Sequence, residues 1–168
     1  RLSSPKEIFN LQADIVITNR LPCADFAELE NFIQNIQETG AKLIYDIDDN
    51  LLYLHETHPE KDYYASKAPL VYKLLTEADC VWISTKKLAL HLRPYCKKQR
   101  VVENYVNENL FTTAKPIAKS PTTKFKILYM GTSSHKRDLA QVITALRELN
   151  SQGKEFELHL IGINDTRL

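Results

Sequence analysis

Three carboxylates stand together where a short apolar run ends. Residues 43–50 read Leu-Ile-Tyr-Asp-Ile-Asp-Asp-Asn, which places Asp46, Asp48 and Asp49 at the end of that run. In α/β proteins the chemistry usually lies at the edge of the sheet where the parallel strands end. Aspartates at such an edge can accept hydrogen bonds from a substrate, take part in proton transfer, act as a nucleophile or bind a cation. The stretch therefore predicts a functional site at one edge of a sheet. Which chemistry takes place there depends on the residues that the other elements bring to that edge.

The residues before this stretch predict a strand and a helix. Residues 13–18 form a β-branched run typical of a buried strand. Asp25 and Glu28 have the spacing of a capping box, apolar residues recur behind them at helical spacing, and Gly40 is suited to end a helix. The strand, the helix and the acidic strand should be joined by a right-handed parallel crossover.

The alternation of strands and helices continues after the acidic stretch. Residues 51–68 are polar and aromatic, and we expect a loop or a short irregular helix there. A helix with Pro69 near its first turn should follow, then a strand at 80–83, a helix capped by Thr85 and a short strand at 101–102. This order favours an α/β fold in which helices flank parallel sheets.

A second set of elements begins further along the chain. A strand at 125–130, a tight loop at 131–135, a helix broken by Gly153 and a strand at 156–161 are expected. Composition shifts before them, over 106–124, and we place a domain boundary there. The predicted division is an N-terminal domain at 1–112, a linker at 113–124 and the start of a second domain at 125–168.

Composition excludes some classes of protein. The 168 residues are 43% hydrophobic with a formal net charge of +1, and no apolar run approaches the ~20 residues of a membrane span. Near-neutral charge and the lack of a motif disfavour nucleic-acid binding. Three scattered cysteines indicate reduced thiols in a cytosolic protein. An opening on Arg1 and an end soon after a strand lead us to expect a piece of a longer protein.

Five segments in a fixed order form a recognisable pattern. They are Tyr-Asp-Ile-Asp-Asp at 45–49, Glu-Ala-Asp-Cys-Val-Trp-Ile-Ser-Thr-Lys-Lys-Leu-Ala at 77–89, Val-Glu-Asn-Tyr-Val-Asn at 102–107 with Phe111, Ile-Leu-Tyr-Met-Gly-Thr at 127–132 with His135 and Asp138-Leu139, and Leu-His-Leu-Ile-Gly at 158–162. This order resembles the group 1 type of glycosyltransferase, whose two facing Rossmann-like domains form the GT-B fold, and the resemblance covers roughly residues 13–162.

The resemblance implies transfer of a sugar from a nucleotide-sugar donor to a carbohydrate, lipid-linked or protein acceptor in the cleft between the domains. Asp48 and Asp49 would be the catalytic carboxylates on the acceptor side, with Thr85 and Asn104 in the cleft. No bound metal and no cofactor other than the nucleotide-sugar substrate are implied, and the location would be cytoplasmic or peripheral at the inner face of the membrane. The residues implied to bind the donor are Gly131, Thr132, Ser133, His135, Lys136 and Arg137. A glycine after a strand and a helix N-terminus suit a diphosphate, to which the two cations would add charge.

The chain departs from the family pattern at three places. Thr132 stands where a basic residue is common, and Glu103-Asn104-Tyr105 replaces a segment with a tight glycine turn. The Glu-x7-Glu motif that holds the donor would lie beyond Leu168. We therefore expect residues 1–168 to be inactive on their own.

Two alternatives remain open. The acidic stretch nearly matches the first motif of a haloacid-dehalogenase-like phosphatase, with Asp46 as the nucleophile and Asp48 as the general acid/base beside Mg²⁺. Against it, Asn50 replaces the threonine of that motif, and a full strand–helix unit precedes it. The chain could also be a non-catalytic binding module. Its basic face at 86–100 could meet anionic lipid headgroups or simply be a solvated surface.

Overall fold

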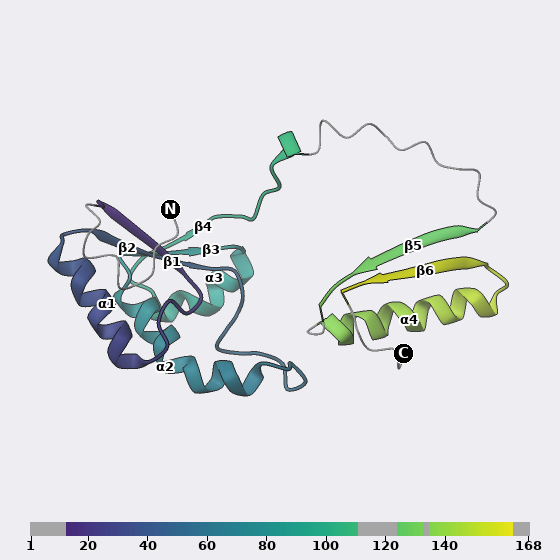
Figure 1. Ribbon diagram of the computed structural model, residues 1–168, viewed down its shortest axis with the longest axis horizontal. Helices are drawn as coiled ribbons and strands as arrows, with labels where there is room; N and C mark the ends of the chain where they lie inside the picture. The colour runs from purple at the N-terminus through teal and green to yellow at the C-terminus, as the bar shows by residue number, and fades with distance from the viewer. Residues whose placement is uncertain (1–12, 111–123, 133–134, 163–168) are drawn as a thin grey trace. The chain divides into compact units, whose positions relative to one another are not determined.

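The computed structural model describes residues 13–110, 124–132 and 135–162. The chain divides into two compact units, Arg1–Val106 and Asn107–Leu168. Each unit is described by itself (Figure 1). In the described residues, no helix combines the length and the apolar character needed to cross a membrane.

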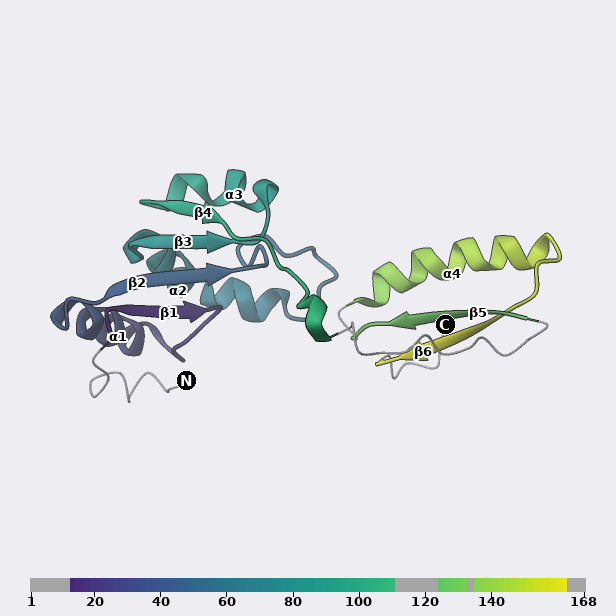
Figure 2. The same ribbon diagram turned by 90° about the horizontal axis from the view of Figure 1, so that it is seen from above.

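The first unit is built on one parallel sheet. Its strands lie in the order β1-β2-β3-β4, and every neighbouring pair is parallel (Figure 2). Helices flank this sheet, which confirms the predicted α/β class and is compatible with a Rossmann-like arrangement. The elements are β1 (Ile15–Asn19), α1 (Phe26–Glu38), β2 (Lys42–Ile47), α2 (Lys61–Glu77), β3 (Cys80–Ile83), α3 (Lys86–Leu92), the 3₁₀ turn η2 (Arg93–Tyr95) and β4 (Gln99–Val101).

Local sequence signals fix both ends of α1. The Asp25 carboxylate accepts a hydrogen bond from the Glu28 amide at 2.9 Å, and the Glu28 carboxylate accepts one from the Ala24 amide at 2.8 Å. Amides at a helix start have no partner within the helix, so this reciprocal pair satisfies two of them. Gly40, just past the helix, has φ +75°, which glycine adopts at no steric cost. The predicted capping box and stop are confirmed.

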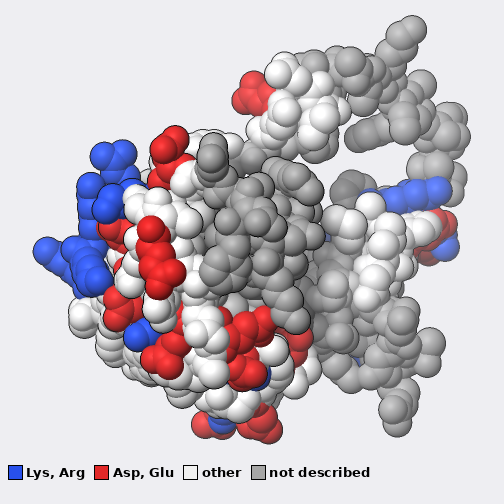
Figure 3. Space-filling view, turned by 60° about the vertical axis from the view of Figure 1, so that its left-hand side comes forward, with Lys and Arg blue, Asp and Glu red and all other residues white. Residues whose placement is uncertain are grey.

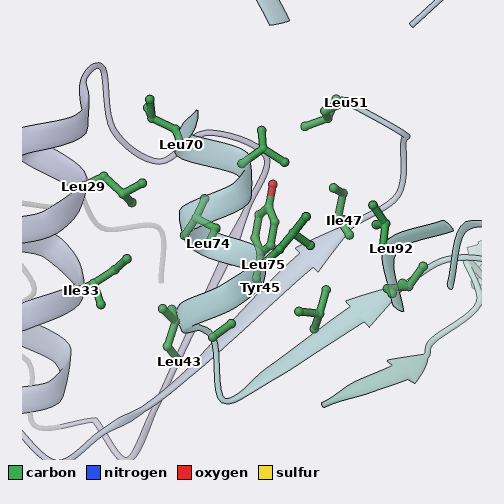
Figure 4. Close-up of a cluster of buried hydrophobic side chains, with 14 of the residues drawn as sticks. Leu29, Ile33, Leu43, Tyr45, Ile47, Leu51, Leu70, Leu74, Leu75 and Leu92 are labelled. Atoms are coloured by element: carbon green, nitrogen blue, oxygen red, sulfur yellow. The ribbon is translucent and has the colours of Figure 1, made fainter. Parts of the chain in front are cut away.

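The core of the first unit lies between one face of the sheet and the helices. Alternate residues of β2 and β3 are buried and belong to the same apolar cluster as residues of α1, α2 and α3. Figure 4 shows Leu74 and Leu75 from α2 beside the Tyr45 ring, and Leu29 from α1 farther out in the same apolar cluster. Apolar side chains of three helices therefore cover one face of the sheet, and their burial stabilises the unit. The strand predicted at 13–18 forms as β1, but the prediction that it is buried is wrong: none of its residues is buried, and Ile15 and Ile17 are each 54% exposed.

Two expectations about element bounds were wrong. Helix α2 begins at Lys61, so Pro69 lies inside it and not near its first turn. An interior proline costs a helix one hydrogen bond, but α2 buries Tyr64 before Pro69 and Leu70 after it, and this packing outweighs the local preference. Strand β4 lies at Gln99–Val101, earlier than the predicted 101–102, because its ladder with β3 starts at Gln99.

The second unit contains the predicted strand, helix and strand. β5 (Phe125–Met130) and β6 (Phe156–Ile161) pair in parallel, α4 (Lys136–Ser151) connects them, and a 3₁₀ turn η3 (Glu108–Leu110) precedes them. On α4, Leu139 is fully buried and Leu146 nearly so, whereas Leu149 is 42% exposed. The expected linker at 113–124 lies outside the described residues except for Lys124.

Candidate functional site

The acidic stretch reaches the edge of the first sheet at which all four strands end. Because the strands are parallel, their carboxyl ends meet at this edge. Arg20 follows β1, Asp48 and Asp49 follow β2, and Ser84 follows β3. We call this group of four residues the acidic edge.

Arg20 is the centre of the acidic edge. Its Nη2 donates a hydrogen bond to Asp49 Oδ2 at 2.9 Å and lies 3.8 Å from Asp48 Oδ1. Its Nη1 donates to the Tyr64 hydroxyl at 3.4 Å. The guanidinium therefore joins both predicted catalytic carboxylates to helix α2, which carries Tyr64.

The backbone of Arg20 is held in an unusual conformation. Its φ is +49°, and it is the only non-glycine residue with positive φ among those described. The Tyr45 hydroxyl, on a fully buried side chain, donates to the Arg20 carbonyl at 2.9 Å. A left-handed conformation costs an ordinary L-residue roughly 1–2 kcal/mol, so the contacts around Arg20 must compensate for it.

Burial and contacts shift the pKa of three groups here. Burial raises the pKa of Tyr45 well above the usual tyrosine value, so its hydroxyl stays a donor. The hydrogen bond to Tyr64 is the main cause that raises the pKa of the Arg20 guanidinium, with Asp48 and Asp49 adding to it. Burial, then the charge of Asp48, raises the pKa of Asp46.

Ser84 fixes the main chain of the acidic edge. Its side chain is nearly buried, and its hydroxyl donates to the Asp48 carbonyl at 2.9 Å. The next residue, Thr85, caps α3 by accepting a hydrogen bond from the Leu88 amide at 3.2 Å, as predicted. The Thr85 hydroxyl thus has a structural role, while Asn104 is exposed beyond β4.

Asp46 does not join the acidic edge. It lies within β2, paired in register with Asn19 and Trp82, and its two neighbours in the strand, Tyr45 and Ile47, are buried among the helices. Because side chains alternate along a strand, the Asp46 carboxylate points to the other face of the sheet. Among the residues that the structure describes, no group of three or more His, Cys, Asp or Glu side chains is arranged to hold a metal ion.

In the second unit, two glycines meet where β5 and β6 end. The Gly131 amide donates to the Ile161 carbonyl at 3.0 Å. Gly162 has φ +82°, and a Cβ added there would lie 2.5 Å from the Gly131 carbonyl oxygen. Only residues without a side chain allow this close approach at Gly162.

Some of the predicted donor-binding residues lie close to these glycines along the chain. Thr132 and Arg137 are exposed, and Arg137 belongs to the first turn of α4. His135 Nδ1 lies 2.9 Å from the Asp138 carboxylate, while its carbonyl accepts from the Tyr129 hydroxyl at 3.4 Å. Ser133 lies outside the described residues, and Lys136 is placed only by its backbone at the start of α4.

The predicted basic face contains exposed lysines and arginines on α3, η2 and the segment that leads into β4. Figure 3 shows Lys and Arg side chains gathered at one margin of the first unit, next to a surface with many acidic side chains. Part of this charge is balanced within the unit, because Lys97 lies 3.5 Å from Glu77. The surface is therefore less basic than the run 86–100 indicates.

Arg20 is the residue that sequence reasoning missed. It directly follows the first strand, and nothing in its neighbours along the sequence indicates a functional role. The available signal was positional: a charged residue that directly follows a parallel strand shares an edge with the residues that follow the next strand. No protein-family model matches the chain, and neither does any curated protein, so its function must be argued from this geometry.

Proposed function

We propose that the chain is part of a glycosyltransferase of the two-domain GT-B type, which transfers a sugar from a nucleotide-sugar to an acceptor. In this proposal the first unit is the acceptor side and carries the catalytic carboxylates Asp48 and Asp49. The second unit is the beginning of the donor side, with its site at the glycine pair Gly131 and Gly162.

The acidic edge is the observation that carries the proposal. Asp48 and Asp49 are half-exposed, with side-chain exposures of 47% and 58%, and they stand at the edge where α/β sheets bind ligands. Carboxylates in that position can accept hydrogen bonds from sugar hydroxyls and can stabilise positive charge that develops at an anomeric carbon.

The glycine pair of the second unit supports the donor side. A strand that ends in glycine directly before a helix lets a phosphate approach the backbone, and the free amides of a helix start favour an anion. Gly131 directly follows β5 in the loop that leads to α4 at Lys136, and Gly162 directly follows the neighbouring strand β6. This support is weaker than that of the acidic edge, because an ordinary turn from strand to helix also uses glycine.

The phosphatase alternative is less well supported. It needs Asp46 as a charged nucleophile, but burial, followed by the charge of Asp48, raises the pKa of the Asp46 carboxylate and so disfavours its charged form. Asp49 is already hydrogen-bonded to the Arg20 cation and Asp48 lies 3.8 Å from the same nitrogen, so a metal ion bound to these carboxylates would be repelled by a neighbouring positive charge.

Because residues 1–168 are expected to be inactive on their own, the test is a nucleotide-release assay of the purified longer protein of which we propose this chain to be part, with UDP-, GDP- and dTDP-hexoses, each with and without methyl glycosides as acceptors. We expect release that depends on one nucleotide-sugar, falls at least roughly tenfold in Asp48→Asn, and falls roughly three- to tenfold in Asp49→Asn at acceptor concentrations below KM. Glu38→Gln is the matched control, because this exposed carboxylate ends α1 at the opposite edge of the sheet. Magnesium-dependent hydrolysis of p-nitrophenyl phosphate that is lost in Asp46→Asn, with no release from any nucleotide-sugar, would replace the proposal with the phosphatase.

A further inference from the structure

We propose that Arg20 is a positioning residue that gives Asp48 and Asp49 different roles: it fixes the Asp49 side chain and leaves Asp48 to accept a hydrogen bond from the acceptor hydroxyl. This inference rests on the proposed function for the role of Asp48. The positioning of Asp49 stands on its own geometry.

The two carboxylates differ in how Arg20 meets them. Asp49 Oδ2 receives a hydrogen bond from Nη2 at 2.9 Å, within the range of a charge-assisted bond. Asp48 Oδ1 lies 3.8 Å from the same nitrogen, which is an ion pair but is too long for a hydrogen bond. Asp49 is therefore oriented by Arg20, whereas Asp48 keeps its lone pairs available.

Asp48 is held through its main chain instead. The nearly buried Ser84 hydroxyl donates to the Asp48 carbonyl at 2.9 Å, and the Ser84 amide donates to the Ile47 carbonyl at 3.4 Å. Its backbone is thus tied to β3, while its carboxylate faces solvent at 47% exposure. A fixed backbone with an accessible carboxylate is what a group that contacts substrate requires.

Arg20 is itself prepared for this role before any ligand binds. The buried Tyr45 hydroxyl donates a hydrogen bond to the Arg20 carbonyl, and Arg20 Nη1 donates one to the Tyr64 hydroxyl. Both the main chain and the guanidinium of Arg20 are therefore anchored. Strained backbone persists only where surrounding contacts enforce it, and such residues cluster at functional sites. The same cation also offsets the repulsion between two adjacent carboxylates.

The first test needs no turnover. The χ1 rotamers of Asp48 and Asp49 are measured from ³J(Hα–Hβ) couplings in the wild type, Arg20→Asn and Arg20→Lys. Asparagine tolerates the left-handed backbone, so Arg20→Asn removes the cation without forcing a new conformation. We expect a single Asp49 rotamer in the wild type that becomes averaged in Arg20→Asn, partial averaging in Arg20→Lys, and no change at Asp48. Arg93→Ala, an exposed arginine on η2, is the matched control. An unchanged Asp49 rotamer in Arg20→Asn overturns the positioning role.

The second test uses nucleotide release with the methyl glycosides above. We expect Arg20→Asn and Asp49→Asn each to raise the KM for the glycoside about three- to tenfold without changing the KM for the nucleotide-sugar. The double variant should be no worse than either single variant, because both lose the same contact. Asp48→Asn should instead lower kcat. Effects of Arg20→Asn and Asp49→Asn that multiply would overturn the coupling.

The two tests separate this inference from the proposed function. If the longer protein, with the wild-type sequence in this part, releases nucleotide from none of the sugars, the proposed function fails and the role of Asp48 fails with it. The rotamers of Asp49 still decide whether Arg20 positions that side chain. If release occurs but Asp48→Asn leaves kcat unchanged, the proposed function stands and Asp48 does not accept the hydrogen bond of the acceptor hydroxyl.

Discussion

Removing one hydroxyl, in Tyr45→Phe, tests whether the interior of the protein supports the acidic edge. The Tyr45 side chain is fully buried, and its hydroxyl donates to the Arg20 carbonyl at 2.9 Å. Phenylalanine keeps the ring that fills the core and removes only this donor. The variant therefore isolates a single contact between the core and Arg20.

The expected cost follows from that contact. A typical hydrogen bond contributes about 1 kcal/mol net, and a buried acceptor left without a donor costs about 1–3 kcal/mol. Because Arg20 is exposed, water can reach part of its main chain, and we expect the lower end, about 1–2 kcal/mol. For a unit of this size, each 1 kcal/mol lowers the melting temperature by roughly 4–8 °C.

The stability of the first unit can be measured separately from that of the second. The chain has a single tryptophan, Trp82, which lies in β3, so its fluorescence in urea follows unfolding of this sheet. Tyr45→Phe should shift the urea midpoint without changing the slope of the transition. Tyr105→Phe is the matched control, because Tyr105 is 83% exposed and donates to the exposed Glu103 carboxylate at 2.8 Å. Equal midpoints for Tyr45→Phe and the wild type would refute the reasoning.

Two further predictions concern the glycine pair and the start of β2. Gly162→Ala should destabilise the second unit more than Gly153→Ala, and the measurement is the rate of amide exchange in β5 and β6. Both glycines have positive φ, but only at Gly162 would the new Cβ meet the Gly131 carbonyl oxygen, 2.5 Å away. Equal effects would show that strain, and not the close approach, is decisive. The Asp79 carboxylate accepts from the Leu43 amide at 2.9 Å, and this bond, ahead of the contacts with a neighbouring lysine, lowers its pKa. Its stabilisation should be full above the usual aspartate pKa and lost as pH falls through the lowered value, so urea midpoints of the wild type and Asp79→Asn should converge in acid. A gap that persists at low pH would contradict this.

Much of the fold follows from local signals. The capping box at Asp25 and Glu28 and the stop at Gly40 could be read from spacing, because each satisfies backbone groups next to it in sequence. The β-branched run that became β1 and the parallel pair in the second unit could be read from pattern. Helix α2 was misjudged, because the penalty of Pro69 is local whereas its compensation is the burial of residues on both sides of it.

The candidate site was only half predictable. The sequence by itself determined that Asp48 and Asp49 follow a strand, since both belong to one short segment. Only the tertiary structure decided their partner: Arg20 lies 29 positions before Asp49, and parallel pairing of β1 with β2 brings the two strand ends together. Only the tertiary structure decided, too, that Asp46 lies on the face of the sheet opposite the helices, because the face on which the helices pack sets which alternate side chains of β2 are buried. Spacing along the chain determines the order of such groups, and long-range packing determines which of them meet.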